Sequence, residues 1–273
     1  MRIPFLSGAM LALAAGGAMA GTVITLDQSV NGGPIMQQTI ALAADRMKMT
    51  SPQNQTIYRG DQNKVWIVRP EDKAYVELTP ESMAQMKAMM DQKMVQMQQR
   101  LASLPPEERK QMEAMLASRG MGPSAPSVPP PVTYEKAGDP KKIGAYTCTP
   151  FRVKMPGVPD SEFCMAPLSE LGLTRGDMQA FIGFGKFMSQ MGGIGTQRSP
   201  MSRLDFDSIK KQIGFDGFPV QTSLNAPDVH YAVQTTLKSV EHDDPPTGTF
   251  DVPAGYIRED MGAKMGHGPR APG

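Results

Sequence analysis

Short runs of alternating apolar and polar residues fill an early part of the chain, from Thr22 to Leu78. Turn-forming residues separate these runs, at 31–34, 44–45, 51–54, 60–63 and 70–72. This pattern is typical of a meander of antiparallel strands with one face on a core and the other in solvent. The run Val-Trp-Ile-Val at 65–68 is apolar on both faces, so we expect Trp66 to lie in a covered part of the sheet.

Strand-like runs return in the second half of the chain, after a long helical segment. They span residues 132–136, 143–154, 160–166, 219–224 and 229–241. The 27 glycines and 25 prolines among 273 residues supply many turns around these runs. Together with the meander, the runs predict an α+β fold built on an antiparallel sheet.

A long helix is predicted to begin at Thr79, the N-cap, with Pro80 at its first position, and to run to about Ser103. Its apolar residues step by three or four and form one stripe: Met83, Met86, Met90, Met94, Met97 and Leu101. A second helix begins after Pro105, and we expect a Met-rich helical hairpin over residues 79–119. The Pro-rich segment that follows, 120–131, predicts an extended linker inside the same domain.

Two further helices are predicted downstream. Thr174 and Asp177 have the spacing of a capping box, which begins a helix running to about Met191. The apolar surface of this helix is broad and includes Phe181, Phe184 and Met188, so we expect it to be well buried. A shorter helix is predicted near 207–213.

The first 20 residues have the pattern of a secretory signal peptide. One charge at Arg2 precedes an apolar run that ends in Ala18-Met19-Ala20, a small-x-small cleavage site. We expect cleavage before Gly21, a periplasmic location, a mature chain that is soluble, and a single domain over residues 21–257. The Gly- and Pro-rich residues 258–273 are expected to form a disordered tail.

Cys148 and Cys164 are the two cysteines of the chain. In an exported protein such a pair predicts a disulfide, and the turn-rich residues 155–159 between them favour a hairpin. A hairpin symmetric about Pro156 would place Cys148 opposite Cys164 and Arg152 opposite Asp160. Closing a loop of about 15 residues stabilises a fold by about 3 kcal/mol. A metal site or a redox pair is the alternative, but neither a CxxC spacing nor a nearby histidine supports it.

Charge and motifs exclude several classes of function. The 28 basic and 27 acidic residues nearly cancel and form no basic patch, which argues against a nucleic-acid partner. The sequence holds no Gly-x-Ser-x-Gly elbow, no His-Glu-x-x-His and no phosphate-binding glycine loop. We therefore predict a protein that is not an enzyme and has no cofactor, although a pair of carboxylates brought together by the fold would not be visible in the sequence.

Several motifs resemble an exported bacterial family, domain of unknown function 4412. They are Gly60-Asp61 before Lys64-Val65-Trp66-Ile67-Val68, then Pro70-Glu71-Asp72-Lys73-Ala74-Tyr75, and Lys142-Ile143-Gly144-Ala145-Tyr146-Thr147-Cys148. That family is in turn similar to the periplasmic lipoprotein carriers LolA and LolB. The resemblance implies a strongly curved antiparallel sheet, a half-barrel, wrapped around helices, with an apolar hollow that accepts acyl chains.

The 23 methionines suggest two functions. Flexible methionines suit a surface that receives apolar partners of varied shape, and this favours a non-enzymatic protein that binds a lipid, an acyl chain or a lipoprotein segment in an apolar cradle. We expect Trp66, Phe181, Phe184 and Met188 to line that cradle, unless they only fill a closed core. Thioethers also select Cu(I), for which the tail cluster Met261, Met265 and His267 is the candidate site. A structural envelope module without a small ligand is the third hypothesis, and the oligomeric state stays open.

Overall fold

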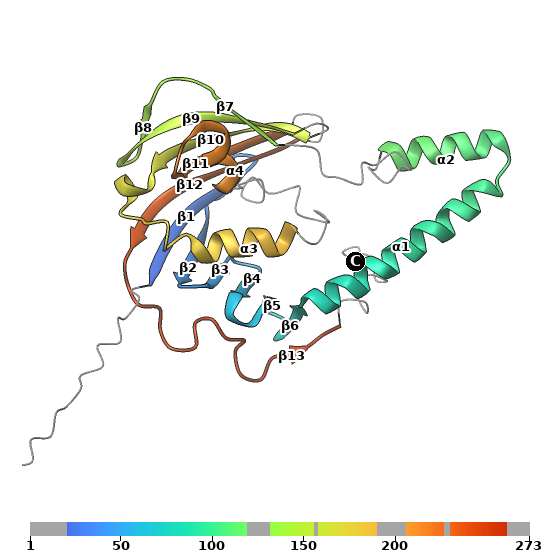
Figure 1. Ribbon diagram of the computed structural model, residues 1–273, viewed down its shortest axis with the longest axis horizontal. Helices are drawn as coiled ribbons and strands as arrows, with labels where there is room; N and C mark the ends of the chain where they lie inside the picture. The colour runs from blue at the N-terminus through green and yellow to red at the C-terminus, as the bar shows by residue number, and fades with distance from the viewer. Residues whose placement is uncertain (1–20, 119–131, 156–157, 190–205, 227–229, 261–273) are drawn as a thin grey trace, which may run out of the picture.

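The protein is a single curved sheet that wraps around two short helices, with a long helical arm projecting from one end (Figure 1). The computed structural model describes residues 21–118, 132–155, 158–189, 206–226 and 230–260. The predicted signal peptide, the whole predicted linker and residues 261–273 lie outside these ranges. The strand order is β13-β6-β5-β4-β3-β2-β1-β12-β11-β10-β9-β7, with β8 paired to β9. The α+β class and the curved antiparallel half-barrel expected from the sequence are confirmed.

The first half of the sheet is the predicted meander, in which each strand pairs with the next. Its strands are β1 (Thr22–Val30), β2 (Met36–Ala43), β3 (Arg46–Thr50), β4 (Gln55–Arg59), β5 (Lys64–Arg69) and β6 (Ala74–Leu78), with the 3-10 turn η1 (Gly60–Gln62) between β4 and β5. The turns require left-handed backbone at positions such as Asn63, where φ is 49°. Asparagine tolerates this conformation better than most residues, which explains its place there.

The second half of the sheet comes from the later strand runs. Its strands are β7 (Thr133–Lys136), β8 (Lys141–Ile143), β9 (Tyr146–Met155), β10 (Val158–Pro167), β11 (Gly217–Ala226) and β12 (Tyr231–Glu241). The antiparallel pair of β1 with β12 joins the two halves, and it links the two ends of the folded chain. The 3-10 turn η2 (Leu168–Leu171) follows β10.

The hairpin of β9 and β10 carries the disulfide, with 5.3 Å between the Cα atoms of Cys148 and Cys164. Its register differs from the symmetric hairpin expected from the sequence. Cys164 lies opposite Pro150, and Arg152 lies opposite Glu162 instead of Asp160. Met155 pairs with Val158, one residue out of the expected register, and an irregularity between Val158 and Ser161 shifts the pairing by one more, so the two cysteines are bonded diagonally.

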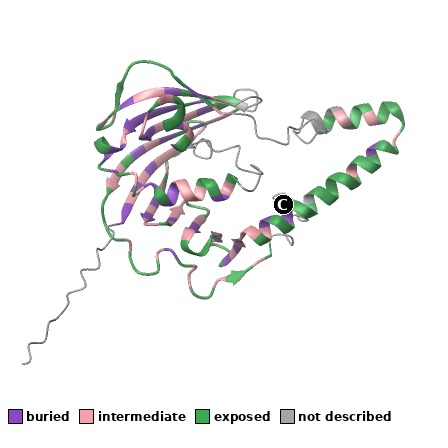
Figure 2. Ribbon diagram, viewed as in Figure 1, coloured by how far each residue is buried: buried purple, intermediate pink, exposed green. Residues whose placement is uncertain are grey.

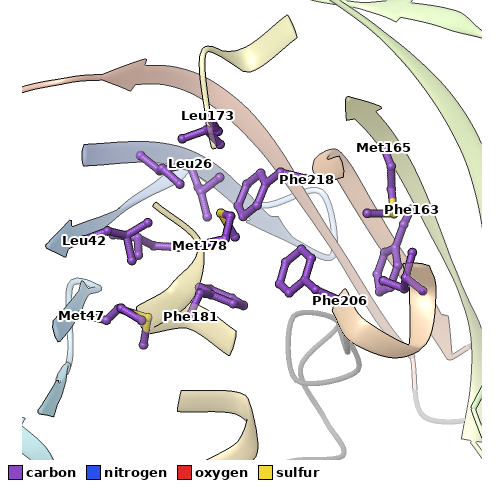
Figure 3. Packing of buried hydrophobic residues seen from close by; sticks show 14 of the residues in the cluster. Leu26, Leu42, Met47, Phe163, Met165, Leu173, Met178, Phe181, Phe206 and Phe218 are labelled. Carbon is purple, nitrogen blue, oxygen red and sulfur yellow. The ribbon is translucent and has the colours of Figure 1, made fainter. Parts of the chain in front are cut away.

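Two helices fill the concave face of the sheet: α3 (Gln179–Ser189) and α4 (Phe206–Ile213). Phe181, Phe206 and Phe218 meet there, with ring centroids 5.4 Å apart for Phe181 and Phe206 and 6.3 Å apart for Phe206 and Phe218 (Figure 3). The predicted helix start at Thr174 is wrong. Thr174 and Asp177 do exchange the hydrogen bonds of a capping box, but they close a turn, and the helix begins at Gln179.

The C-terminal residues 242–260 cross the outer face of the sheet and form a strap. Phe250 packs there against Ile57 and Val68, with Trp66 and Tyr256 at the edge of this second cluster. The strap ends in β13 (Ile257–Arg258), which pairs in parallel with β6. Residues 258–260 of the expected disordered tail are instead ordered, since β13 pairs with β6 and Glu259 also donates its amide to the carbonyl of Tyr75, whereas residues 261–273 lie outside the described residues.

The predicted helical hairpin exists as α1 (Pro80–Ala102) and α2 (Pro106–Ser118). Figure 1 shows the two helices as limbs of an arm that meet at an elbow and extend away from the sheet. Leu101 lies at the elbow and is only 7% exposed. Below, the term arm denotes residues 89–118.

Candidate functional site: a methionine-lined cleft and a helical arm

The first turn of α1 is attached firmly to the edge of the sheet. Thr79 accepts a hydrogen bond from the Ser82 amide through its hydroxyl (3.2 Å), and the Ser82 hydroxyl accepts one from the Thr79 amide (2.9 Å). Pro80 needs no hydrogen-bond acceptor at this position, since the first amides of a helix have no partner within it. This capping box sets the direction in which α1 leaves β6.

A cleft of about 380 Å³ lies where α1 leaves the sheet. Its lining combines apolar and charged side chains: Glu77, Leu78, Ser82, Met83, Gln85, Met86, Met89, Arg258, Glu259 and Asp260. Met83 and Met86 are 6% and 9% exposed, so their side chains form a covered wall, whereas Met89 is 50% exposed at the mouth. The volume is within the usual range of small-ligand sites.

Glu77 is the centre of the charged wall. It accepts a hydrogen bond from the indole N–H of Trp66 (2.9 Å) and forms ion pairs with Arg258 (3.0 Å) and Lys64 (3.6 Å). Burial opposes ionisation of Glu77, but the Trp66 hydrogen bond and the charges of Arg258 and Lys64 outweigh it and lower the pKa of the carboxyl. Glu77 thus stays ionised and holds Arg258 of the strap over the cleft.

The neighbouring strap contact is also ionic. Arg69 of β5 binds Asp72 (2.7 Å) and also binds Glu259. Glu259 lines the cleft, so its ion pair with Arg69 connects the charged wall of the cleft to strand β5. The cleft is therefore built from β6, α1 and β13, which are separated by up to about two thirds of the chain.

Beyond the cleft, α1 continues onto the arm, most of which is exposed (Figure 2). The large apolar side chains exposed there or at its base are Met89 (50%), Met94 (38%), Val95 (52%), Met112 (38%) and Met115 (46%). Of the stripe expected from the sequence, Met83, Met86 and Leu101 are buried, Met94 is exposed and Met97 is intermediate, while the side chain of Met90 lies outside the described residues.

The four residues expected to line an apolar cradle do not come together. Phe181 is 5% exposed and belongs to the aromatic core of Figure 3. Phe184 and Met188 are partly buried against the same core, and Phe184 meets Tyr58 edge-on at 5.9 Å. Trp66 lies on the outer face under the strap, away from the other three.

The covered position of Trp66 agrees with its strand being apolar on both faces. Val65 faces the main core, whereas Trp66 packs with the strap cluster. Alternation along a strand sends successive side chains to opposite faces, which is why Trp66 cannot join Phe181. The sequence indicates that both faces are covered, but it does not indicate what covers each one.

The candidate metal residues of the tail, Met261, Met265 and His267, lie outside the described residues. Within the described ranges, no group of three or more His, Cys, Asp or Glu side chains is placed to hold a metal ion. Sequence reasoning missed the cleft, although it identified Met83 and Met86. No local signal marks Arg258 and Glu259 as their neighbours, because the parallel pairing of β13 with β6 is a long-range contact.

No helix in the described part of the chain combines the length and the apolar character needed to cross a membrane.

Comparisons with solved structures find weak overall similarity. An uncharacterized conserved protein from Thermus thermophilus is 5% identical with a TM-score of 0.43, over 89% of this chain and 91% of that one. PNGF-II is 10% identical with a TM-score of 0.39, over 90% of this chain but 32% of its own. A DUF1329 family protein from Desulfovibrio piger is 8% identical with a TM-score of 0.30, over 86% of this chain and 91% of that one. No curated protein matches the chain significantly.

The sequence profile of one family matches residues 79–256, from the first turn of α1 to the end of the strap cluster. This match confirms the family resemblance drawn from the motifs. Since it spans more than half of the chain, the protein belongs to the family described as domain of unknown function (DUF4412).

Proposed function

We propose that the protein is a non-enzymatic binding protein of the periplasm that receives an apolar ligand, a lipid, an acyl chain or a lipoprotein segment, on the exposed methionines of its arm. The observation that carries this proposal is the exposure of large apolar side chains on the arm, where Met94, Val95 and Met112 are 38%, 52% and 38% exposed. Large apolar side chains that gather on one element in this way mark interaction sites more often than chance exposure does.

The proposed ligand site is on the arm and not on the concave face of the sheet. The concave face holds α3 and α4, whose aromatic rings pack on the sheet. The arm instead presents side chains that gain by being covered, at about 1.5–3 kcal/mol for each fully buried methionine. Unbranched thioether side chains adapt to ligands of different shape, which suits a surface for varied acyl chains.

The periplasmic location is part of the proposal. It is supported by the leader-like residues 1–20 and by the disulfide between Cys148 and Cys164, since disulfides persist in oxidising compartments. Gly21, the expected first residue after cleavage, is buried, and its amide nitrogen donates to Asp244 at 3.0 Å. In the periplasm the chain would meet the apolar components of the cell envelope that the proposal names as ligands.

Native mass spectrometry of the protein purified from its periplasm tests the proposal. We expect lipid or lipopeptide to co-purify with the wild type and 1-palmitoyl-lysophosphatidylcholine to rebind after delipidation. A triple variant with Met94→Gln, Val95→Gln and Met112→Gln should lose this binding, because glutamine has a similar length but a polar end. A control variant with Gln92→Ala, Gln98→Ala and Gln99→Ala, all at exposed positions, should retain it.

Two results would contradict the proposal. A wild-type protein that is free of lipid and does not bind the lysolipid would leave the structural envelope module as the function. Equal binding by the wild type and the glutamine variant would place the ligand elsewhere than on the arm.

A further inference from the structure

Three methionines line the cleft at the base of α1. Met83, Met86 and Met89 all line it, and their spacing of three residues places them within about a third of the helix circumference. Met83 and Met86 are nearly covered, while Met89 is half exposed at the mouth. The arrangement is thus a small, partly dry site with an opening to solvent.

The donor atoms available there are soft. Thioether sulfur selects Cu(I), whereas Mg²⁺ and Ca²⁺ need several oxygen ligands and structural Zn²⁺ is held by Cys or His. In the described ranges no cluster of three His, Cys, Asp or Glu side chains offers such a site. The chemistry of the cleft therefore suits a soft monovalent cation better than a hard divalent one.

The charges of the lining tolerate a cation. Glu77, Glu259 and Asp260 contribute carboxylates, against one guanidinium from Arg258. Arg69 binds Glu259 at the back of this wall, and Arg258 binds Glu77 at 3.0 Å. A positive ion in the cleft would thus enter next to carboxylates that are already held in place, with little repulsion to overcome.

We propose that the cleft binds Cu(I) through the thioethers of Met83, Met86 and Met89. Copper remains Cu(I) when it binds. It reaches the cleft as Cu(I) that is already held by another ligand, since the periplasm is oxidising. Thioethers carry no proton, so binding does not require deprotonation of the ligands. The tail, residues 261–273, is not part of the proposed site.

Titration calorimetry with silver(I) nitrate, a redox-inert analogue of Cu(I), tests the proposal on the full mature chain. A cleft variant combines Met83→Leu, Met86→Leu and Met89→Leu, which preserves volume and costs little stability at each position. We expect it to bind silver(I) at least about tenfold more weakly than the wild type, because ligand loss exceeds the effect of losing an outer partner. The methyl resonances of these three methionines should shift on silver addition in carbon-13 methyl NMR spectra.

Three controls make the outcome specific. A matched variant with Met94→Leu, Met97→Leu and Met112→Leu should bind silver(I) as the wild type does, and zinc(II) should not bind to any variant through the cleft. Truncation after Asp260 should leave both the affinity for silver(I) and the shift of the cleft methionines unchanged. The affinity of the wild type should change little between pH 7 and pH 5, where histidine ligands would become protonated.

The proposal is overturned if silver(I) does not bind, if the cleft variant binds it as tightly as the wild type, or if truncation abolishes binding. Methionine-to-leucine changes keep the apolar surface, so they should leave lysolipid binding intact. Loss of lysolipid binding in the glutamine variant of the arm should in turn leave silver binding intact. The two proposals can therefore fail separately.

Discussion

Met83 and Met94 belong to the same apolar stripe of one helix, yet they should respond very differently to replacement by alanine. Met83 is 6% exposed and packs with the main core, whereas Met94 is 38% exposed on the arm. The pair therefore measures, with one residue type on one helix, where the folded core ends along α1.

The cost at Met83 follows from what is removed. Alanine lacks three of the side-chain groups of methionine, and each group that leaves the core costs about 0.8 kcal/mol, or about 2.4 kcal/mol together. A cavity usually adds to this cost, but the adjoining cleft lets the site relax, so we expect about 2–3 kcal/mol, at the low end for a methionine-to-alanine change. At Met94 the change should stay within about 0.5 kcal/mol, since surface substitutions are small and alanine is a better helix former.

Urea unfolding followed by the fluorescence of Trp66 measures both variants, because Trp66 is the single tryptophan and lies in the sheet. Leucine at each position is the volume-matched control and should cost less than about 1.5 kcal/mol. Equal destabilisation by the two alanine variants would refute the reasoning, since it would mean that the arm packs on the folded domain in solution.

Further predictions concern the disulfide, the cleft and one close contact. Replacing Cys148 and Cys164 together with alanine should destabilise the oxidised protein by about 3 kcal/mol and remove its sensitivity to reductant in thermal melts; an unchanged melting temperature would contradict this. Trp66→Phe keeps the ring but removes the donor to Glu77, which should cost about 1.5–3 kcal/mol at pH 7. Because the pKa of Glu77 is lowered in the fold, the stability that its ionised carboxyl contributes is present above the unfolded pKa and is lost as the pH falls through the folded pKa. Urea titrations from pH 7 to 3 should therefore show that the free energy of unfolding falls less in Trp66→Phe than in the wild type. Gly217→Ala should destabilise by more than about 2 kcal/mol, because the new Cβ would lie 2.3 Å from the carbonyl oxygen of Ala166, and a neutral effect in calorimetry would show that β11 shifts to make room.

The apolar stripe of α1 shows why one sequence pattern leads to buried side chains at one position and exposed side chains at another. A step of three or four residues predicts the helix and its stripe, and both are present in α1. Periodicity reports only which side chains share a face, so it does not say whether another element covers that face. Met83 and Met86 are covered because α1 begins at the edge of the sheet, and Met94 is exposed because the helix continues beyond it.

The hairpin register shows a second limit. The turn residues between the cysteines predict the hairpin, but the pairing of Met155 with Val158 and the irregularity between Val158 and Ser161 together move the partner of Arg152 to Glu162. A single extra residue in one strand changes every partner beyond it, and the local sequence has no clear mark of where that residue lies.

Local physics alone determined much of this protein: the meander of β1–β6, the start of α1 at Thr79, the pairing of the two cysteines and the half-buried position of Trp66. These depend on alternation, capping and chain proximity, which are properties of neighbouring residues. The tertiary structure alone decided that the strap crosses the outer face, that β13 pairs with β6, and that Arg258 and Glu259 meet Met83 in one cleft. Those contacts join residues almost two hundred positions apart, and they form because covering apolar surface on the folded sheet is favourable, whatever the order of the residues along the chain.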